Sequence, residues 1–572
     1  MEWAERAAAG ALAELAYEKA ARLFDQAVEA MGSGGFSPAD RCRVLLGRAG
    51  ALFKAGDVSS AIAAASDAAD EARRAGDPVA MARAAVAFEG VADEAWGRRV
   101  VRIAELALPR LGNDQLEMRA RLTAALATVH SFTLSDGAAD HAEALSRQAL
   151  QLADAAGTSS ALISALRARQ MACADPDGVD NRLEVADRTL SLSAETNDPW
   201  SALWGHLWRI EARCQLGEID AAEYELGPLA SVVERLHQPV AGWHLARTRC
   251  ALAMGRGRLS DADRYLDEMI TLAERGLDAR GKQMHWVIAA KLAQLTGDSK
   301  FDSWLEAMTD ERATPSEVAT RVPLGLWYAE RGQMDRAADQ DQRLPPWRSW
   351  QVPRFVGLVA QDQRARLTAM IGDVDGATVA YQRLLPWARY FVVGGSGLIA
   401  MHGSAQFALG CLAACIGKSD AAVRHLGAAV DANQNAGLPP FEAESRYELA
   451  KVLAHRGRPD DRSEALLLAT NASDTATRLG MSPLRAKSDN LLSTLRGAPQ
   501  PSRSTDLTKR ELEIAALITQ GFTNRQIADL LFVSERTAEN HVQHILTKLG
   551  FQNRTQIALW ATTKGIAPGP RS

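Results

Sequence analysis

The chain has 572 residues, which is more than one hydrophobic core usually holds, so its length predicts several domains or a repeat array. Hydrophobic residues make up 47% of the chain and charged residues 24%, a balance that excludes a disordered protein. The net charge of −5 excludes a polycation.

The cysteines and the N-terminus argue against a metalloprotein and against export. The six cysteines are scattered, with no CxxC pair and no His/Cys cluster at the spacing of zinc ligands. The first residues, Met1 to Glu5, are acidic, whereas a signal peptide begins with positive charge. No apolar stretch reaches the eighteen residues of a membrane span. We therefore expect a cytoplasmic protein with no metal, no cofactor and no membrane contact.

Residues 1–495 show a helical pattern throughout, with Tyr390–Val393 as a short strand-like exception. A unit recurs in which a glycine is followed by an apolar residue two positions later and an alanine five positions later. It begins at Gly56, Gly217, Gly257, Gly332 and Gly372, and at Gly417 without the apolar residue. Several successive copies lie 40 to 45 residues apart.

This pattern resembles the tetratricopeptide repeat, in which the glycine closes a turn between two antiparallel helices and the alanine lies where they cross. Because the spacing exceeds the roughly 34 residues of a regular repeat, it predicts longer, irregular helices stacked as a solenoid. The alternative is a set of unrelated helical hairpins. Between Pro78 and Leu216 the repeat signal fades while the helical periodicity continues.

Three short motifs in this region have alternative interpretations. Gly417-Lys418-Ser419 is the sole Gly-Lys-Ser, but Leu412 stands where the first glycine of a phosphate-binding loop is needed, so we expect no ATP site. Residues 394–397 (GGSG) are interpreted as a flexible loop. Residues 345–350 (PPWRSW) form either a recognition surface or, preferably, the packing of an irregular connection. No catalytic constellation is readable, so we do not expect an enzyme.

Residues 496–505 (RGAPQPSRST) predict a flexible linker, because they are rich in Pro, Ser and Gly. The linker would separate a repeat domain of residues 1–495 from a small domain of residues 506–567. Residues 568–572 would form a disordered tail.

The small domain is predicted to hold four short helices, each with its own start signal. Thr508 with Glu511, and Thr523 with Gln526, have the spacing of capping boxes. Gly521 is expected to end the first helix, and Ser534 to cap the third, which Gly550 ends. The pair of Asn553 and Gln556 would open the fourth.

The third helix has two distinct faces. Ala538, Val542, Ile545 and Leu549 form an apolar stripe, whereas the opposite face carries side chains that can bond base edges. The polar set is Glu535, Arg536, Glu539, Asn540, Gln543 and Thr547. A helix, a tight turn and an amphipathic helix with a polar face indicate a helix-turn-helix.

These residues resemble the DNA-binding domain of the LuxR (GerE-type) regulators. The shared pattern falls on Leu507, Thr508, Arg510, Glu511, Gly521, Thr523, Asn524, Ile527, Ala528, Val533, Ser534, Thr537, His541, Val542, Lys548, Leu549 and Gly550. Glu539 and Ala538 depart from it, since many members carry lysine and valine there. The alternative is a winged-helix-like module that binds only protein.

The resemblance implies roles for individual residues. Thr537 and Lys548 would contact phosphates, with Arg536 and Ser534 close by. Glu539, Asn540 and Gln543 would face the bases, which suits their chemistry, because Asn and Gln pair with adenine and Glu accepts from cytosine. The dimer contact would be supplied by the fourth helix through Ile557, Trp560 and Ala561.

Residues 507–566 carry seven Lys and Arg against five Asp and Glu, a net charge of +2. Because phosphate neutralisation supplies most non-specific affinity, one such domain should bind DNA weakly, and we expect a homodimer on DNA. The N-terminal region also resembles the helical segment of the large ATP-binding LuxR regulators, without their ATPase module, in residues 11–30 and 372–397.

The sequence thus predicts an all-α protein, an irregular tetratricopeptide-like solenoid followed by a four-helix LuxR-type domain. Its predicted function is sequence-specific transcriptional regulation on double-stranded DNA, with an unknown protein or small-molecule effector on the repeats. The alternative is a repeat scaffold for protein partners, with DNA binding secondary.

Overall fold

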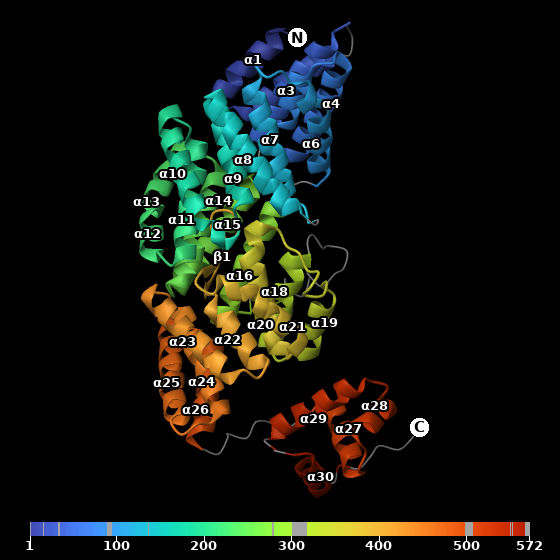
Figure 1. Cartoon of the computed structure of the whole chain (residues 1–572), viewed down its shortest axis with the longest axis vertical. Coiled ribbons are helices and arrows are strands. Elements are labelled where there is room, and N and C mark those ends of the chain that lie inside the picture. Colours follow the sequence, from blue (N-terminus) through green and yellow to red (C-terminus); the bar gives the residue numbers. More distant parts are fainter. Residues whose placement is uncertain are drawn as a thin grey trace. The chain divides into compact units, whose positions relative to one another are not determined.

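The computed structural model describes residues 2–14, 16–31, 35–88, 94–134, 137–276, 279–299, 302, 317–497, 507–549, 551, 553–564 and 566. The chain divides into two compact units, Met1–Leu495 and Arg496–Ser572 (Figure 1). Both units are helical, which confirms the predicted all-α class. Residues 498–505 of the predicted linker and the predicted tail lie outside the described residues.

The first unit is an array of antiparallel helices. Its first half comprises α1 (Glu2–Ala13), α2 (Tyr17–Met31), α3 (Pro38–Lys54), α4 (Val58–Ala75), α5 (Pro78–Ala85), α6 (Glu94–Ala107), η1 (Leu108–Arg110), α7 (Leu116–Phe132), α8 (Ala138–Ala156), α9 (Ser159–Ala172), η2 (Pro176–Gly178), α10 (Val179–Thr196), α11 (Pro199–Leu216), α12 (Ile219–Tyr224), α13 (Leu226–Leu236), α14 (Pro239–Gly255), α15 (Leu259–Gly276) and α16 (Ala279–Thr296). Helix pairs therefore continue through the region where the repeat signal fades.

The second half of this unit contains a two-stranded hairpin between its helices. The elements are α18 (Glu317–Glu330), α19 (Met334–Gln342), α20 (Arg354–Ile371), α21 (Val374–Leu384), η3 (Leu385–Trp387), β1 (Phe391–Gly394), β2 (Ala400–Ser404), α22 (Gln406–Cys415), α23 (Ser419–Asn435), α24 (Pro439–Arg456), α25 (Asp461–Leu479) and α26 (Ser482–Arg496). The strand-like run at Tyr390–Val393 is confirmed as β1, whereas its partner β2 had no signal in the sequence.

The repeated glycine and alanine have the roles that the pattern predicts. All six repeat glycines adopt the left-handed backbone region, with φ between 74° and 89°, which a residue with a Cβ rarely enters. Each alanine five positions later is completely buried, namely Ala61, Ala222, Ala262, Ala337, Ala377 and Ala422. Helix hairpins closed by glycine and packed over alanine therefore build the unit. Gly417 belongs to this series, since it joins α22 to α23.

The tip of the β-hairpin is a buried part of the core, so the interpretation of residues 394–397 as a flexible loop is wrong. The two strands pair antiparallel, with Phe391 opposite Ser404 and Gly394 opposite Ala400. Backbone groups of the tip are held by charged and polar side chains of helices far away in the sequence. Glu211 on α11 accepts from the Gly397 amide at 2.7 Å, and Arg247 on α14 donates to the Ser396 carbonyl at 2.7 Å.

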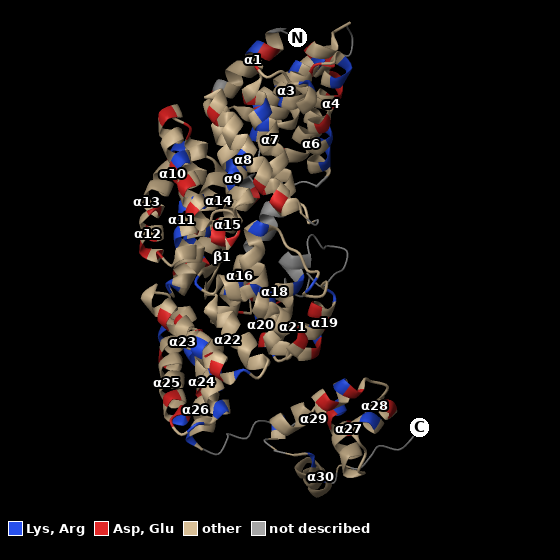
Figure 2. Ribbon diagram, viewed as in Figure 1, with Lys and Arg blue, Asp and Glu red and all other residues tan. Residues whose placement is uncertain are grey.

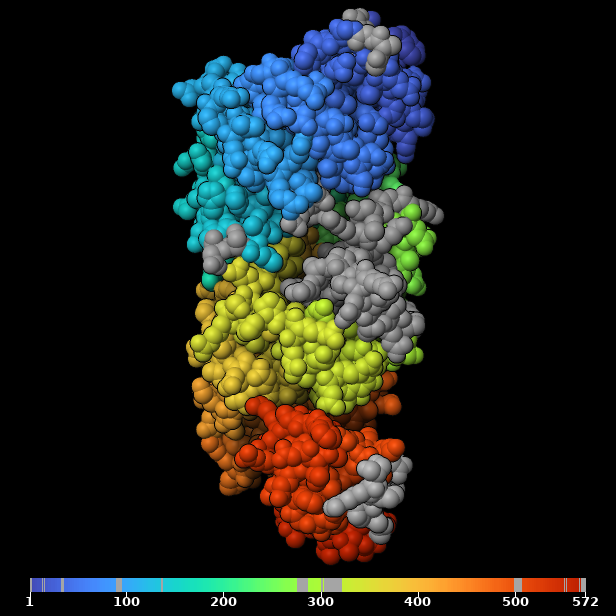
Figure 3. All heavy atoms as spheres, turned by 90° about the vertical axis from the view of Figure 1, so that its right-hand side faces the viewer, coloured from blue at the N-terminus to red at the C-terminus, as the bar shows by residue number. Residues whose placement is uncertain are grey.

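Other sequence-distant contacts show that the array curls back on itself. The Phe132 ring at the end of α7 lies 5.1 Å from the Phe355 ring on α20. The blue-green and yellow stretches that carry these helices adjoin on the face shown in Figure 3. Arg256, after α14, donates to the Ala436 carbonyl at 3.1 Å. The first unit is thus an irregular helical-repeat solenoid in which some helices far apart in the sequence pack together, and this confirms the predicted tetratricopeptide-like architecture.

The aromatic cluster at residues 345–350 packs an irregular connection, as preferred from the sequence. Trp347 and Trp350 are buried, and the guanidinium of Arg364 on α20 lies over both rings, 4.8 and 4.7 Å from their centroids. Its guanidinium also bonds Asp341 at 2.9 Å. Among the described helices, none combines the length and the apolarity that a bilayer-spanning segment needs.

The second unit contains α27 (Lys509–Thr519), α28 (Asn524–Leu531), α29 (Glu535–Leu549) and α30 (Arg554–Thr563). One core joins all four helices, with Ile514, Ile527, Ala538 and Ile557 buried at its centre. These are the four predicted helices. Gly521 adopts the left-handed region after α27, as predicted, whereas Gly550 lies outside the described residues.

Candidate nucleic-acid interface

Every helix of the second unit begins at the side-chain cap that the sequence predicts. Both capping boxes are present, with Thr508 and Glu511 at α27 and Thr523 and Gln526 at α28. At α29 the Ser534 hydroxyl accepts from the Thr537 amide at 3.1 Å. At α30 the Asn553 side chain accepts from the Gln556 amide at 3.1 Å. The caps fix where the turn between α28 and α29 begins and ends.

Helix α29 presents one apolar and one polar face, as predicted. Ala538, Val542 and Ile545 are buried in the core of the unit. Glu539, Asn540 and Gln543 are exposed on the other side, and within the described residues their side chains make no hydrogen bond or ion pair. Their donors and acceptors are therefore available to base edges, which is what a reading helix requires.

The residues predicted to contact phosphates differ in whether their side chains already have partners among the described residues. Ser534 and Thr537 share a hydroxyl–hydroxyl hydrogen bond of 2.7 Å at the start of α29. Arg536 next to them is exposed, and its guanidinium has no partner among the described residues. A cation and hydroxyls at a helix N-terminus suit a phosphate oxygen, because the helix dipole also favours an anion there.

Lys548 has a structural partner that the sequence did not reveal. Its ammonium lies 2.6 Å from Oε2 of Glu511, whose side chain is only 4% exposed. The same carboxylate accepts from the Thr508 amide at 2.7 Å and from the Thr508 hydroxyl at 2.9 Å. We call these three residues the Glu511 clamp. It joins the start of α27 to the last turn of α29.

The Glu511 clamp alters the acid–base behaviour of its carboxyl group. Burial alone would raise the pKa of Glu511, but the hydrogen bonds from Lys548 and Thr508 outweigh it and hold the pKa below its ordinary value. Glu511 is thus a charged, fully bonded group. The role of Lys548 as a phosphate contact stays a prediction, and it would have to be shared with this structural role.

Sequence reasoning missed Arg525 as a candidate phosphate contact. It lies exposed in the first turn of α28, and in the described part of the chain its guanidinium has no partner. Three other cations are engaged: Lys548 with Glu511, Arg510 with Glu513 at 3.0 Å, and Arg554 with the Phe522 carbonyl at 2.5 Å. Acidic and basic positions alternate along α28 and α29 in Figure 2. The usable positive charge is therefore smaller than the composition indicates.

The predicted dimer contact needs correction. Ile557 and Ala561 are completely buried in the unit's own core, so neither offers a surface to a partner. Their spacing marked the face of α30 that packs inward. On the outer side Leu559 is 71% exposed, and Trp560 beside it is partly exposed. A pairing surface on this helix would therefore consist of Leu559 with Trp560.

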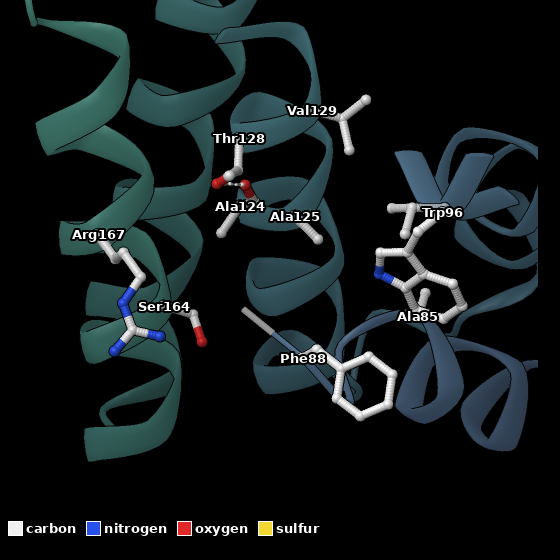
Figure 4. A pocket seen from close by; sticks show the side chains of 10 residues that line it. Ala85, Phe88, Trp96, Ala124, Ala125, Thr128, Val129, Ser164 and Arg167 are labelled. Atoms are coloured by element: carbon white, nitrogen blue, oxygen red, sulfur yellow. Dashed lines mark hydrogen bonds between the residues drawn. The ribbon is translucent and has the colours of Figure 1, made fainter. Parts of the chain in front are cut away.

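A small pocket in the first unit is too small for a ligand. It lies beside α7, where Phe88 and Trp96 line one side and Ser164 and Arg167 of α9 line the other (Figure 4). Its volume is about 30 Å³, the share of one water molecule in the liquid. A larger cavity in this unit is described below.

Comparison with known proteins assigns the second unit to a family. Residues 505–561 match the pattern described as "Bacterial regulatory proteins, luxR family" (GerE). This confirms the LuxR-type resemblance for the C-terminal domain.

Curated relatives match in the same region. The transcriptional regulatory protein LnrK of Bacillus subtilis is 35% identical over 81 residues, 14% of this chain and 37% of LnrK. The DNA-binding transcriptional activator DevR/DosR of Mycobacterium tuberculosis is 42% identical over 73 residues, 13% of this chain and 34% of the activator. The oxygen regulatory protein NreC of Staphylococcus aureus is 48% identical over 60 residues, 10% and 28% of the two chains. The chain thus spans about a third of the length of these relatives.

Solved structures match this chain loosely. The Cut9–Hcn1 tetramer of the APC/C gives a TM-score of 0.37 at 14% identity, over 85% of this chain and 95% of the other. Yeast Tom70 gives 0.25 at 11% identity, over 86% and 95%. At such low TM-scores neither likeness carries a conclusion about this chain.

Proposed function

We propose that this chain is a sequence-specific transcription regulator that acts in the cytoplasm. Its second unit would read double-stranded DNA, and its repeat unit would sense an effector or a partner protein. The observation that carries the proposal is that Glu539, Asn540 and Gln543 on α29 are exposed and make no side-chain hydrogen bond or ion pair with the residues that the structure describes. The opposite face of the helix is buried in the core of a LuxR-type domain.

The reading role falls on Glu539, Asn540 and Gln543. Asn540 and Gln543 can each bond adenine through two hydrogen bonds, and Glu539 can accept from the amino group of cytosine. Because these side chains are exposed and make no hydrogen bond within the described residues, binding DNA breaks no hydrogen bond of theirs to that part of the chain.

The phosphate-contacting role falls on Ser534, Arg536, Thr537 and Lys548, and the structure adds Arg525 as a candidate. With Arg510, Lys548 and Arg554 engaged internally, one unit has few cations left for phosphates. A single unit should therefore bind DNA weakly, and this expectation supports the proposal that two copies pair on DNA, with half-sites about 10 base pairs apart.

The reading face is tested by selecting DNA sites with the full chain and with two variants. Asn540→Ala should lose about 1–3 kcal/mol on the preferred site and relax the preference at one base position. Arg536→Ala should weaken binding to all sequences alike and reduce the salt slope by about one unit. An unchanged motif with Asn540→Ala would show that another side of the helix faces the bases. If the full chain selects no sequence at all, the repeat-scaffold alternative is favoured.

Pairing is tested on α30. Leu559→Glu places a charge in the proposed contact and should abolish cooperative occupation of two half-sites, while the affinity for a single half-site remains. Gln520→Glu adds the same charge at an exposed position after α27 and serves as the matched control. Equal effects of the two variants would assign the loss to general charge repulsion and remove Leu559 from the contact.

A further inference from the structure

The first unit contains a large cavity, lined mainly by helices of its second half. Helix α16 lines it together with α18, α20, α22, α24 and α26, and its volume is about 830 Å³. Pockets for small ligands generally measure about 300–1,000 Å³ and combine an apolar lining with a few polar groups. The apolar part of this lining includes Leu326, Met370, Phe407, Met481 and Leu484.

Three charged side chains lie together in the lining without bonding one another. The Lys291 ammonium is 3.7 Å from Oε1 of Glu444, and Nη1 of Arg366 is 3.6 Å from Oε2 of the same carboxylate. Both distances exceed that of a hydrogen bond. Within the described residues, neither Lys291 nor the Glu444 carboxylate makes any hydrogen bond. We call Lys291, Arg366 and Glu444 the open triad.

The open triad is buried, so its unused bonding capacity is costly. The side chains of Lys291, Arg366 and Glu444 are 10%, 12% and 22% exposed. Burial lowers the pKa of Lys291, although Glu444 partly opposes this shift. A buried charge without hydrogen bonds costs free energy, and a bound molecule that supplies them recovers it.

The charge around the open triad is balanced. Behind it, Asp362 lies 2.9 Å from Nε of Arg366 and bonds the ring of His402 at 3.2 Å. Burial lowers the pKa of His402 to about 4, so the imidazole is neutral at pH 7. Two cations therefore face two carboxylates. A ligand with a net charge would disturb this balance in a buried site, whereas a zwitterion preserves it.

Other ion pairs in the same cavity are complete, which singles out the open triad. Lys451 donates to both carboxylate oxygens of Glu448, at 3.1 and 2.8 Å. Lys487 bonds Glu330. These pairs need no ligand to satisfy them.

We propose that this cavity binds a small amino-acid-type zwitterion with an apolar side chain, the ammonium group on Glu444 and the carboxylate on Lys291 and Arg366. The apolar side chain would lie among Met370, Phe407 and Met481. The inference rests on the proposed function in that it assigns the effector site of the repeat unit. Because the ligand brings donors and acceptors together, it completes the hydrogen bonds of all three side chains.

The test is calorimetric titration of the full chain, without DNA, with L-phenylalanine, L-leucine and L-methionine. Phenethylamine and 3-phenylpropionate each lack one of the two charges and serve as matched probes. At least one amino acid should bind saturably, and the L-phenylalanine analogues should bind roughly tenfold more weakly or worse, as expected for a lost charged hydrogen bond. Equal binding of the analogues, or no binding of any amino acid at about 10 mM, would overturn the proposal.

Two variants assign the binding to the open triad. Glu444→Gln should abolish it, whereas Glu442→Gln, on α24 but outside the cavity lining, should leave it unchanged because that carboxylate pairs with Arg446. Met481→Trp fills the apolar part, leaves all charges in place and should also block binding. Binding that persists in Glu444→Gln and in Met481→Trp would place the ligand elsewhere. Since no DNA is present, these results are independent of the Asn540→Ala test.

Discussion

Two buried carboxylates, one in each unit, differ in the hydrogen bonds that they receive. In the second unit the buried Glu511 carboxylate receives three close hydrogen bonds, from the amide and hydroxyl of Thr508 and from Lys548. In the first unit Glu444 faces two cations at 3.6 and 3.7 Å and bonds neither. A saturated charge fixes the geometry of a fold, whereas an unsaturated one inside a cavity leaves bonds for a ligand to make.

The largest expected effect is the loss of stability of the second unit when the Glu511 clamp is removed. Glu511→Ala removes the capping box of α27 and leaves Lys548 without its partner, so it should destabilise the second unit by about 2–3 kcal/mol. Glu513→Ala removes only an exposed ion pair on the same helix and should cost a few tenths. Urea unfolding of residues 496–572, followed by the fluorescence of Trp560, measures both. Similar losses would show that the Glu511 clamp is not structural.

In the first unit, the cost of adding a Cβ to a glycine should depend on how tightly that glycine is packed. Gly397→Ala would place a Cβ 2.8 Å from Leu207 at a φ of +81°, so it should cost more than about 2 kcal/mol. Gly417→Ala has a similar φ of +76° but meets nothing within 4 Å, so it should cost about 1 kcal/mol. Thermal unfolding of the full chain compares the two variants. Equal losses would mean that the hairpin tip is not tightly packed.

The sequence predicted interactions between residues close together in the chain, but not those between residues far apart. The caps at Thr508, Thr523, Ser534 and Asn553 each act within three residues, so the spacing alone located them. The repeat glycines likewise close local turns. The hairpin tip, the Glu511–Lys548 pair and the open triad join residues 37 to 188 positions apart, and no local pattern reports such contacts. The helical periodicity correctly predicted α30, but Ile557 and Ala561 lie on the face that packs into the core and not on a dimer surface.

Lowering the pH should reduce the stability that the Glu511 clamp gives to the second unit. Because the folded pKa of Glu511 lies below its ordinary value of 4.5, its contribution to stability is complete above that pH and is lost as the pH falls through the folded pKa. Lys548→Met removes one hydrogen bond, so it should cost about 1–2 kcal/mol at pH 7 and move the acid loss to higher pH. Denaturation of residues 496–572 between pH 7 and pH 3 would reveal the shift. An identical pH profile in the variant would exclude Lys548 as its cause.

The smallest effect is expected on the reading face. Asn540→Ala should change the stability of the second unit by no more than a few tenths of a kcal/mol, because its side chain is exposed and unbonded within the described residues. The same unfolding assay applies. A loss above about 1 kcal/mol would mean that Asn540 supports the fold, and its effect on DNA could then not be assigned to base contact.

The buried hairpin tip also bears on how the chain is made. Residues 396 and 397 form hydrogen bonds with Trp208, Glu211 and Arg247, which lie 149 to 188 positions earlier in the chain. An ideal repeat array can fold one neighbour at a time, but here α11 and α14 must wait for the hairpin to emerge. At general synthesis rates of about 5–20 residues per second, that interval lasts roughly 10–40 seconds. During it the side chains of Glu211 and Arg247 lack the backbone partners that they have in the finished chain, so the middle repeats cannot reach their final packing.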